Sequence, residues 1–434
     1  MKVIVVGAGI AGLSAAIGLR RAGHEVLILD KSSLAHEVGA AIHVQPNASR
    51  IIAQWGFDFQ RARLVTAKSI NFTSGDNLHI LSDDDLSDIE DKFGSGYFYS
   101  HRVDLHAELM LLATQEEGQG TPAMIQNKSE VVGYNTETGS VTLANGTTMT
   151  ADLIVGADGI HSSAVKEILG YENSAVPTGI ACFRLLLSVE EIQEDPECAF
   201  LMEDMEGRLR TFIAPQNGHG RVLWYPCREN KILNVAFTCP DREELKATEG
   251  WHNTVPNEIF LDELKGFHPS LRHLLAKGKD VRLWKLLSRA PLPTWHRGKL
   301  VIIGDAAHPM LPFQGQGGAQ AIEDGCALGI LLSSLPNSTP ETLTSRLKSF
   351  ETIRKNRASA LQIFSSAGLE EADKVKESAR PFLKKGEIVP STPADYQEYI
   401  FRHDVSSKSK QELERIQKIQ EEEVVTAALV SVQA

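Results

Sequence analysis

Blocks of apolar residues alternate with glycine-rich and polar turns at the start of the chain. A continuous β-branched run, Val3–Val6, is typical of a strand that is buried on both faces of a parallel sheet. A glycine-rich turn over residues 7–12 follows and leads into a segment with apolar residues at helical spacing. A second apolar run, Val26–Leu29, ends in Asp30. This order predicts a βαβ unit within the first 30 residues.

The middle of the chain has a different pattern. A hairpin is predicted at Asn145-Gly146, and the apolar run Leu153–Val155 after it predicts another buried strand. From about Gly179 onward, short strand-like runs are separated by polar turns, which suits an antiparallel sheet with one covered face. The strands predicted for this sheet are Ala181–Val189, Leu209–Ala214, Val222–Pro226 and Ile232–Cys239.

The α/β pattern returns in the last third of the chain. A strand at Leu300–Ile303 leads through a glycine-rich turn into a helix that runs to Leu332, and a second helix follows over about Glu341–Ser366. Two α/β segments on either side of a strand-rich segment indicate one discontinuous domain with an insert. The expected α/β domain comprises residues 1–178 and 275–365, and the expected insert comprises residues 179–274. Residues about 66–98 are a candidate addition to the sheet of the insert. Residues 366–434 are expected to form a C-terminal helical tail.

Composition excludes several classes of protein. The 44 Lys and Arg residues against 56 Asp and Glu residues leave a net charge of −12, which argues against non-specific nucleic-acid binding. The five cysteines form no C-x-x-C pair, so we expect neither a disulfide framework nor a metal site, and we expect the protein to be cytoplasmic. No apolar run approaches the roughly 18 residues that a membrane helix needs, so no membrane span is expected.

The first glycine-rich turn has the spacing of a dinucleotide-binding fingerprint. Gly7 would permit a tight turn, Gly9 would let the backbone approach a pyrophosphate, and Gly12 would allow close packing of helix on strand. The start of the following helix offers free N–H groups and a positive dipole end to the phosphates. Asp30 stands where it can accept hydrogen bonds from a ribose. The alternative is a purely structural glycine turn.

A second constellation some 300 residues downstream favours a flavin over a nicotinamide as the bound dinucleotide. Asp305 follows a predicted strand, where its carboxylate can bind the ribityl hydroxyls of a flavin. The turn after it aims a second helix start at a ring that becomes anionic when it is reduced. The residues of this turn that we assign to the cofactor are Pro312, Gly315, Gly317 and Gly318.

Together with the turn at Asp158-Gly159, these motifs resemble the FAD-dependent aromatic hydroxylases. These are the group A flavoprotein monooxygenases related to 4-hydroxybenzoate and salicylate hydroxylases, and the resemblance covers about residues 1–365 and is closest to the salicylate hydroxylase-like branch. It implies an α/β fold, with a Rossmann-like FAD-binding domain of the 4-hydroxybenzoate hydroxylase type, an inserted antiparallel-sheet substrate domain and C-terminal helices. Further FAD contacts implied by the resemblance are Lys31, Ala41, Arg102, Asp158 and Gly159.

Some positions of these motifs have other interpretations. Asp30 replaces the commoner Glu of the family, and Ala41 stands where many members have Gly. Asp158-Gly159 can be a simple strand-to-helix turn, although in the family it serves both FAD and transient NAD(P)H binding. Arg102 taken alone would more often be solvated or salt-bridged. The stretch Phe350–Arg357 resembles a helical Tyr/Phe-Glu-x-x-Arg-x-x-Arg sequence of the family.

Two polar residues interrupt the apolar strands of the insert and are the candidate catalytic residues. A buried guanidinium at Arg184 needs a partner, and an anionic phenolate or carboxylate would supply one. Tyr225 could hydrogen-bond the same oxygen, as an Arg and a Tyr do in relatives that hydroxylate or dearomatise phenols. The alternatives are a surface arginine on an edge strand and a core tyrosine, and Arg210 is a rival for the role of Arg184.

The resemblance implies a monooxygenase in which NADH or NADPH reduces FAD and O2 then forms a flavin C4a-hydroperoxide. The expected reaction is hydroxylation of a small phenolic or aromatic carboxylate substrate, with decarboxylation or dearomatisation as variants. A flavin-dependent dehydrogenase, reductase or epoxidase on the same fold is one alternative, and a non-oxygenating flavin redox sensor or binding protein is another. A homodimer is compatible with the sequence.

Overall fold

The chain folds into two compact units. The computed structural model describes residues 1–33, 39–215, 220–250, 253–368 and 373–433, with side chains up to residue 422. Unit 1 comprises residues 1–35, 109–173 and 291–434, and unit 2 comprises residues 36–108 and 174–290. These boundaries differ from the expected domains, because residues 36–108 pack within unit 2 and the C-terminal helices pack within unit 1.

Unit 1 is built on a six-stranded sheet with the order β19-β20-β12-β1-β2-β8. Only β19 runs antiparallel to its neighbour; the other strands are parallel. The apolar runs predicted as strands form its centre, and Val5 and Ile28 are fully buried there. The strands are β1 (Lys2–Val6), β2 (Glu25–Leu29), β8 (Met124–Gln126), β12 (Leu153–Gly156), β19 (His296–Arg297) and β20 (Leu300–Ile302).

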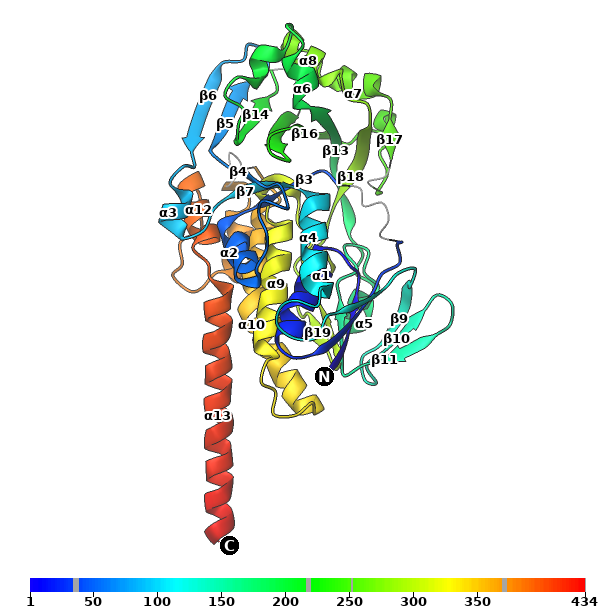
Figure 1. Ribbon diagram of the computed structural model, residues 1–434, viewed down its shortest axis with the longest axis vertical. Coiled ribbons are helices and arrows are strands. Elements are labelled where there is room, and N and C mark those ends of the chain that lie inside the picture. The colour runs from blue at the N-terminus through cyan, green and yellow to red at the C-terminus, as the bar shows by residue number, and fades with distance from the viewer. Residues whose placement is uncertain (34–38, 216–219, 251–252, 369–372, 434) are drawn as a thin grey trace. The chain divides into compact units, whose positions relative to one another are not determined.

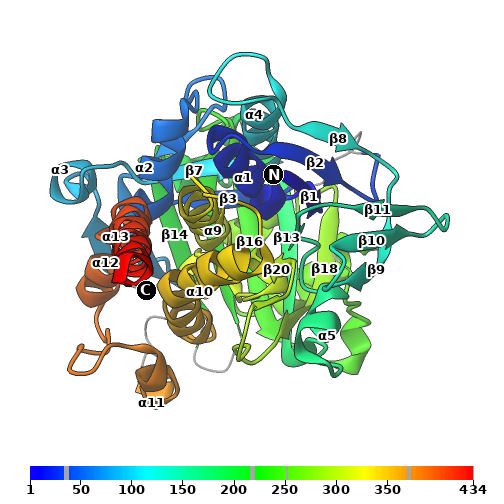
Figure 2. The ribbon, with the colours of Figure 1, turned by 90° about the horizontal axis from the view of Figure 1, so that it is seen from below.

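Two helices of unit 1, α1 (Ile10–Arg21) and α9 (Gly317–Leu331), pack closely on each other. A Cβ at Gly325 would lie 2.4 Å from the backbone carbonyl carbon of Ser14, and a Cβ at Gly329 would lie 2.5 Å from that of Gly18. Residue order therefore increases along both helices in the same direction, and both begin at the same end. Figure 2 shows α9 beside α10, which spans Pro340–Phe364.

The remaining elements of unit 1 are shorter, apart from the last helix. The hairpin predicted at Asn145-Gly146 is present between β10 and β11, which pair antiparallel. Helix α13 packs on α9 and α10, and its C-terminal end extends beyond them (Figure 1). These elements are β9 (Val131–Asn135), β10 (Ser140–Leu143), β11 (Thr148–Thr150), α5 (Ala164–Leu169), η3 (Gly304–Ala306), η4 (Pro312–Gln314), α11 (Lys376–Ala379), η6 (Arg380–Phe382), α12 (Pro393–Phe401) and α13 (Val405–Gln433).

None of the helices in the described part of the chain is long and apolar enough to cross a bilayer.

Unit 2 contains an eight-stranded sheet with the order β17-β18-β13-β16-β15-β14-β5-β6. Its strands pair antiparallel except for β14 and β5, which are parallel. The strands predicted for the insert are present as β13 to β16, and residues 69–85 extend the sheet beyond them. The strands are β5 (Ser69–Ser74), β6 (Ile80–Asp85), β13 (Val176–Ser188), β14 (Arg208–Ile213), β15 (Arg221–Cys227), β16 (Ile232–Pro240), β17 (Thr254–Val255) and β18 (Val281–Ser288).

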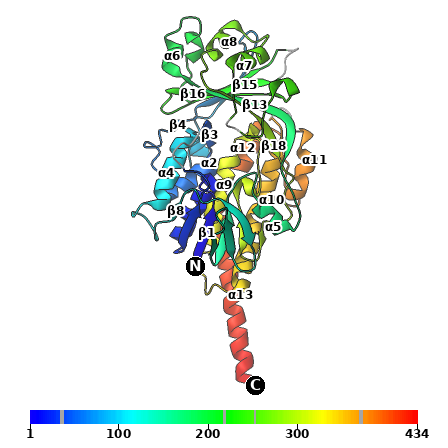
Figure 3. The same cartoon turned by 90° about the vertical axis from the view of Figure 1, so that its right-hand side faces the viewer.

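One face of this sheet carries the apolar core of unit 2. Phe183, Trp224 and Val235 are buried on it, and the short helices α6, α7 and α8 cover it (Figure 3). Because successive side chains of a strand point to opposite faces, the neighbours Arg184 and Tyr225 lie on the other face. The covering elements are α6 (Val189–Gln193), η1 (Ala199–Met202), η2 (Glu243–Leu245), α7 (Asn257–Glu263) and α8 (Pro269–Leu275).

A three-stranded sheet with the order β3-β7-β4 completes unit 2. Its strands come from residues 36–108, the segment that also supplies β5 and β6. The other elements of this segment are β3 (Ala41–Val44), α2 (Pro46–Trp55), β4 (Val65–Thr66), α3 (Ile89–Phe93), β7 (Phe98–His101) and the start of α4 (Arg102–Thr114).

Gly329→Ala tests the close approach of α1 and α9. The added methyl group would overlap the backbone of Gly18, so we expect a loss of about 1–3 kcal/mol in the free energy of unfolding. Gly250→Ala is the control, because a Cβ there meets no heavy atom of the described residues within 4 Å. Chemical denaturation of both variants measures the difference. Equal stabilities would contradict the packing described here.

Candidate active site

The motif turns singled out in the sequence lie side by side at one edge of the unit 1 sheet. In the parallel strands β1, β12 and β20, Val6 pairs with Gly156 and Gly156 pairs with Ile302. The three strands therefore end level with one another. The turns that follow them meet at the carboxyl edge, where open α/β sheets bind their ligands.

The fingerprint turn is built around two glycines with different roles. Gly7 has a positive φ of 102°, and a Cβ there would lie 2.4 Å from the carbonyl oxygen of Ala157 in the neighbouring turn. A Cβ at Gly9 would meet no heavy atom of the described residues within 4 Å beyond its chain neighbours. Helix α1 begins there without a side-chain cap from the described residues. The turn thus leaves space beside the first N–H groups of the helix, which have no acceptor within the helix, and this fits a pyrophosphate.

Asp30 is held next to this turn by backbone and side-chain donors. Its Oδ2 accepts a hydrogen bond of 2.7 Å from the backbone N–H of Ala8. Its Oδ1 accepts from the backbone N–H and the hydroxyl of Ser32, at 2.8 and 2.6 Å. A carboxylate has about four acceptor positions, so Asp30 retains capacity for a ribose hydroxyl. Lys31, the next residue, is exposed.

Asp158 lies in the turn that touches Gly7. Tyr134 donates its phenol proton to Asp158 Oδ2 at 2.8 Å. Burial raises the pKa of Asp158, and hydrogen bonds from Ser162 and Tyr134 oppose that effect. The neighbouring Gly159 has a positive φ of 83° and is open on the side of its missing Cβ. A buried carboxylate and an open glycine therefore lie next to the fingerprint turn.

The third turn starts at Gly304 and contains Asp305, which is exposed in the short helix η3. The chain passes through Pro312 and Gly315 and enters α9 at Gly317 without a side-chain cap from the described residues. Since α1 and α9 begin at the same end, two positive helix ends lie on the same side of unit 1. The residues present fit an FAD dinucleotide, which carries both phosphates and a ring that is anionic when reduced.

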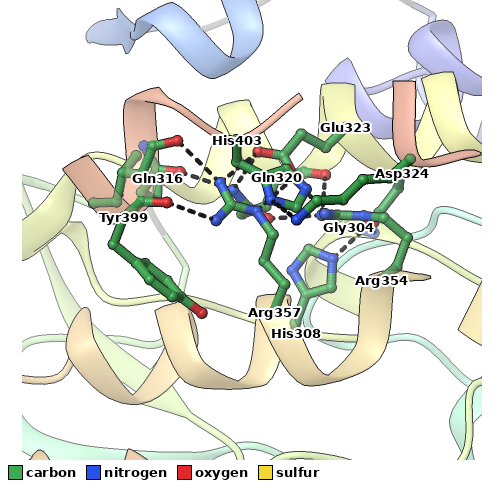
Figure 4. A network of polar contacts seen from close by, with 12 residues as sticks. Gly304, His308, Gln316, Gln320, Glu323, Asp324, Arg354, Arg357, Tyr399 and His403 are labelled. Atoms are coloured by element: carbon green, nitrogen blue, oxygen red, sulfur yellow. Dashed lines mark hydrogen bonds and ion pairs between the residues drawn. The ribbon is translucent and has the colours of Figure 1, made fainter. Parts of the chain in front are cut away.

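A buried network of charges fixes the third turn (Figure 4). Asp324 in α9 accepts from the backbone N–H of Gly304 at 2.9 Å and contacts His308 Nε2 at 2.6 Å. Arg354 in α10 donates to Asp324 at 2.8 Å and also pairs with Glu323. Arg357 donates twice to Glu323, at 2.9 Å each. The network thus connects α10 to the turn that carries Asp305.

The sequence resemblance singled out Arg354 and Arg357 but not the acids that they bind. Burial by itself would raise the pKa of Glu323. The positive charges of Arg357 and Arg354 outweigh burial and hold this pKa well below its ordinary value. The signal in the sequence is a pair of adjacent acids, Glu323-Asp324, inside a helix that carries no other charged residue. Charges at such positions are rarely buried unless they are paired.

Two of the expected cofactor contacts lie in unit 2. Strand β3 pairs with β7, and the N–H of Arg102 donates to the carbonyl oxygen of Ala40 at 3.0 Å. The N–H of Ala41 donates to Asn234 Oδ1 at 3.0 Å. The structure therefore brings Arg102 and Ala41 together within unit 2, and the other expected cofactor contacts belong to unit 1.

Arg184 and Tyr225 share the face of the unit 2 sheet that is opposite its apolar core. The charge of Arg184 acts on Tyr225, and Arg184 Nε is buried with no hydrogen-bond partner among the described residues. The guanidinium also lies over the ring of Trp284, at 5.7 Å from its centroid. Arg210 pairs directly with Trp224 across the strands and so lies on the core side. The rival arginine is therefore on the wrong face to act with Tyr225.

An aromatic cluster that the sequence analysis did not identify surrounds Tyr225. The ring of His43 meets Tyr225 edge-on with centroids 4.6 Å apart, and Tyr99 lies 4.9 Å from Tyr225. Tyr97 contacts both His43 and Tyr99. Burial raises the pKa of Tyr225, whose hydroxyl therefore keeps its proton. No periodic pattern marks these residues, because they come from the short strands β3 and β7 and the residue before β7.

Comparisons with known proteins agree with this geometry. The chain matches the family described as "FAD binding domain" over residues 1–365 and belongs to it. It is 41% identical over 392 residues to the FAD-dependent monooxygenase phomE' of Diaporthe leptostromiformis, covering 90% of this chain and 97% of that relative. It is 32% identical to the hispidin-3-hydroxylase of Neonothopanus nambi, with 96% of this chain and 97% of the relative covered.

A solved structure shows the same fold. A salicylate hydroxylase in a substrate complex superposes with a TM-score of 0.72 at 22% identity, over 95% of this chain and 98% of the other. The expected fold, a Rossmann-like FAD-binding domain with an inserted, mainly antiparallel sheet and C-terminal helices, is confirmed. The chain belongs to the FAD-dependent monooxygenases, as the resemblance implied.

Arg354→Gln tests the buried network. The change leaves Glu323 and Asp324 short of positive charge in the interior, so we expect a loss of about 3–5 kcal/mol in the free energy of unfolding. We also expect less bound flavin per chain, because the Gly304 turn loses its support. Chemical denaturation and flavin absorbance measure the two effects. Lys231→Gln, which breaks the exposed pair with Glu229, is the control and should leave both the stability and the flavin content nearly unchanged.

Burial of the His43 imidazole should make the stability of the folded protein depend on pH. Burial and the charge of Arg184 lower the pKa of His43 to about 3, against about 6.5 in an unfolded chain. The unfolded state therefore binds this proton first as the pH falls below 6.5, and the native state loses stability. Between pH 8 and pH 5 this titration should lower the free energy of unfolding of the wild-type protein by about 2 kcal/mol. His43→Gln should lack this decrease, as measured by denaturation at both pH values. Parallel pH curves for the two proteins would contradict this.

Proposed function

We propose that this monooxygenase uses NADH or NADPH and O2 to hydroxylate a phenolic or aromatic carboxylate substrate. One observation carries the proposal: the guanidinium of Arg184 has a buried Nε without a hydrogen-bond partner among the described residues, on the face that it shares with Tyr225. An unpaired buried donor of a charged group is costly. An anionic oxygen from a ligand would remove that cost by accepting from the planar guanidinium.

The surroundings of Arg184 suit an aromatic ring that carries this oxygen. The rings of His43, Tyr99 and Tyr225 contact one another at centroid distances of 4.6 to 5.3 Å and offer aromatic edges and faces to a planar ligand. Because its pKa is raised, Tyr225 acts as a hydrogen-bond donor and not as a phenolate. Two donors would thus bind the phenolate oxygen and hold the electron-rich ring in position for oxygen transfer.

The residues of the three turns would hold FAD, which when bound and reduced by NAD(P)H would activate O2, so that one oxygen atom is transferred to the ring and the other leaves as water. The chain's own residues bind and orient the cofactor: the starts of α1 and α9 are placed for the phosphates and the ring, and Asp30 for a ribose hydroxyl. Asp158-Gly159 is proposed to serve both FAD and transient NAD(P)H binding. The residues that we propose to contact FAD are Gly7, Gly9, Gly12, Asp30, Lys31, Ala41, Arg102, Asp158, Gly159, Asp305, Pro312, Gly315, Gly317 and Gly318.

The curated relatives support oxygen insertion over simple electron transfer. One relative is named an FAD-dependent monooxygenase and another is named for hydroxylating hispidin. Both are aligned over nearly the whole of this chain. A dehydrogenase or a redox sensor on the same fold would use the same cofactor contacts, so oxygen incorporation into product is the property that separates these functions.

The test is a screen of phenols and salicylates with the FAD-loaded protein, for substrates that stimulate NADH or NADPH oxidation. Those that do are then incubated under ¹⁸O2. We expect one labelled oxygen atom in the aromatic product, detected by mass spectrometry. Nicotinamide oxidation without label in the product of any accepted substrate would overturn the proposal.

Arg184→Ala tests the substrate site in the same assay. Loss of a charged hydrogen-bond donor should raise KM roughly tenfold or more and lower the yield of product per NAD(P)H, while FAD stays bound. Arg210→Ala is the matched control, because Arg210 lies on the core side of the same sheet and should leave KM unchanged. If Arg184→Ala instead releases the flavin, the assignment of Arg184 to the substrate is wrong.

A further inference from the structure

His43 in β3 is held in one orientation by a chain of hydrogen bonds. Its Nδ1 lies 2.7 Å from the hydroxyl oxygen of Tyr97. Gln45 Nε2 donates to that same oxygen at 3.2 Å. Because Tyr97 Oη also accepts from Gln45, we assign the phenol proton of Tyr97 to the hydrogen bond with His43 Nδ1. A neutral imidazole whose Nδ1 accepts a hydrogen bond carries its proton on Nε2.

The neighbours of His43 keep the ring in place and keep it neutral. The rings of Tyr97, Tyr99 and Tyr225 lie around it at centroid distances of 5.7, 5.3 and 4.6 Å. The charged group that acts on it is the Arg184 guanidinium, whose positive charge, together with burial, lowers the pKa of His43 to about 3. His43 is thus a fixed, uncharged donor through the neutral pH range.

The polar groups of this face are donors toward a ligand. Arg184 offers N–H groups only, and Tyr225 keeps its phenol proton. The groups that act electrostatically on His43 and Tyr225 include the cation Arg184 and no carboxylate of the described residues. A cluster of donors without an anionic acceptor discriminates against neutral ligands and in favour of an ionised oxygen, which can accept from all of them.

We propose that His43 is a specificity-determining residue of the substrate site, which donates a hydrogen bond from Nε2–H to the ionised oxygen that Arg184 binds. The proposal rests on the function proposed above. Tyr97 and Gln45 act through His43 and are positioning residues. Since His43 does not change its charge near neutral pH, the pH dependence of kcat/KM should follow the ionisation of the substrate.

The first test compares two variants by titrating the FAD-loaded protein with a phenol that the enzyme accepts, and following the change in flavin absorbance. His43→Leu removes the donor and should raise the substrate Kd and KM roughly tenfold. His43→Gln places an amide N–H near the position of Nε2 and should recover most of the affinity. The methyl ether of the same phenol has no ionisable oxygen, so it should bind the wild-type protein and His43→Leu equally.

The second test uses the pH profile. Over a series of ring-substituted phenols, the pKa seen in kcat/KM of the wild-type enzyme should move with the pKa of the phenol. Tyr97→Phe should raise KM several-fold without introducing a new pKa. A pKa that stays constant across the series and disappears in His43→Leu would mean that His43 titrates during catalysis, which overturns the proposal.

The outcomes separate this inference from the proposed function. If the wild-type protein inserts no labelled oxygen into any phenol, the proposed function fails, and the binding titration still measures the contribution of His43. If the wild-type protein hydroxylates a phenol and His43→Leu binds that phenol as tightly as the wild type, the inference fails and the proposed function stands. Loss of affinity for the methyl ether as well would show a packing role instead of a donor role.

Discussion

Unit 1 depends on one interaction above the others, the burial of two adjacent carboxylates on helix α9. Glu323 and Asp324 are fully buried, so their charges must be compensated within the protein. Arg354 and Arg357 supply the compensation from α10, and Asp324 also accepts from the backbone of Gly304. Such a network adds little stability over an apolar core, but breaking it is costly. It therefore restrains the position of the turn that carries Asp305.

In unit 2 the corresponding constraint is the alternation of side chains along the strands. One face packs Phe183, Trp224 and Phe237 into an apolar core, and the opposite face is left for polar chemistry. Arg184 and Tyr225 lie on that second face because each is next in its strand to a residue of the apolar core. A shift of one residue in a strand would exchange the two faces, so the apolar core and the donor cluster stabilise the same register.

Much of this arrangement could be predicted from residue patterns, and the exceptions have a common cause. The strands β1, β12 and β20 and the turns after them are marked by continuous apolar runs and glycine spacing, which depend on local geometry. Within residues 36–108 only the addition of residues about 66–98 to the sheet of the insert was expected, and no pattern marked His43 or Tyr97. The choice between Arg184 and Arg210 also stayed open, since both are arginines that follow an apolar residue in a predicted strand.

The sequence by itself indicated a dinucleotide-binding fold and carried the resemblance to the FAD-dependent hydroxylases, because glycine spacing and an acid after a strand are local features that do not depend on contacts with distant residues. Tertiary structure decided which side chains act together. Strand pairing placed Arg210 on the core side and Arg184 with Tyr225, and the pairing of β3 with β7 brought His43 into contact with Tyr97, the residue before β7. Contacts between residues far apart in the chain depend on which strands pair and in which register, and the pattern within one strand does not specify its partner.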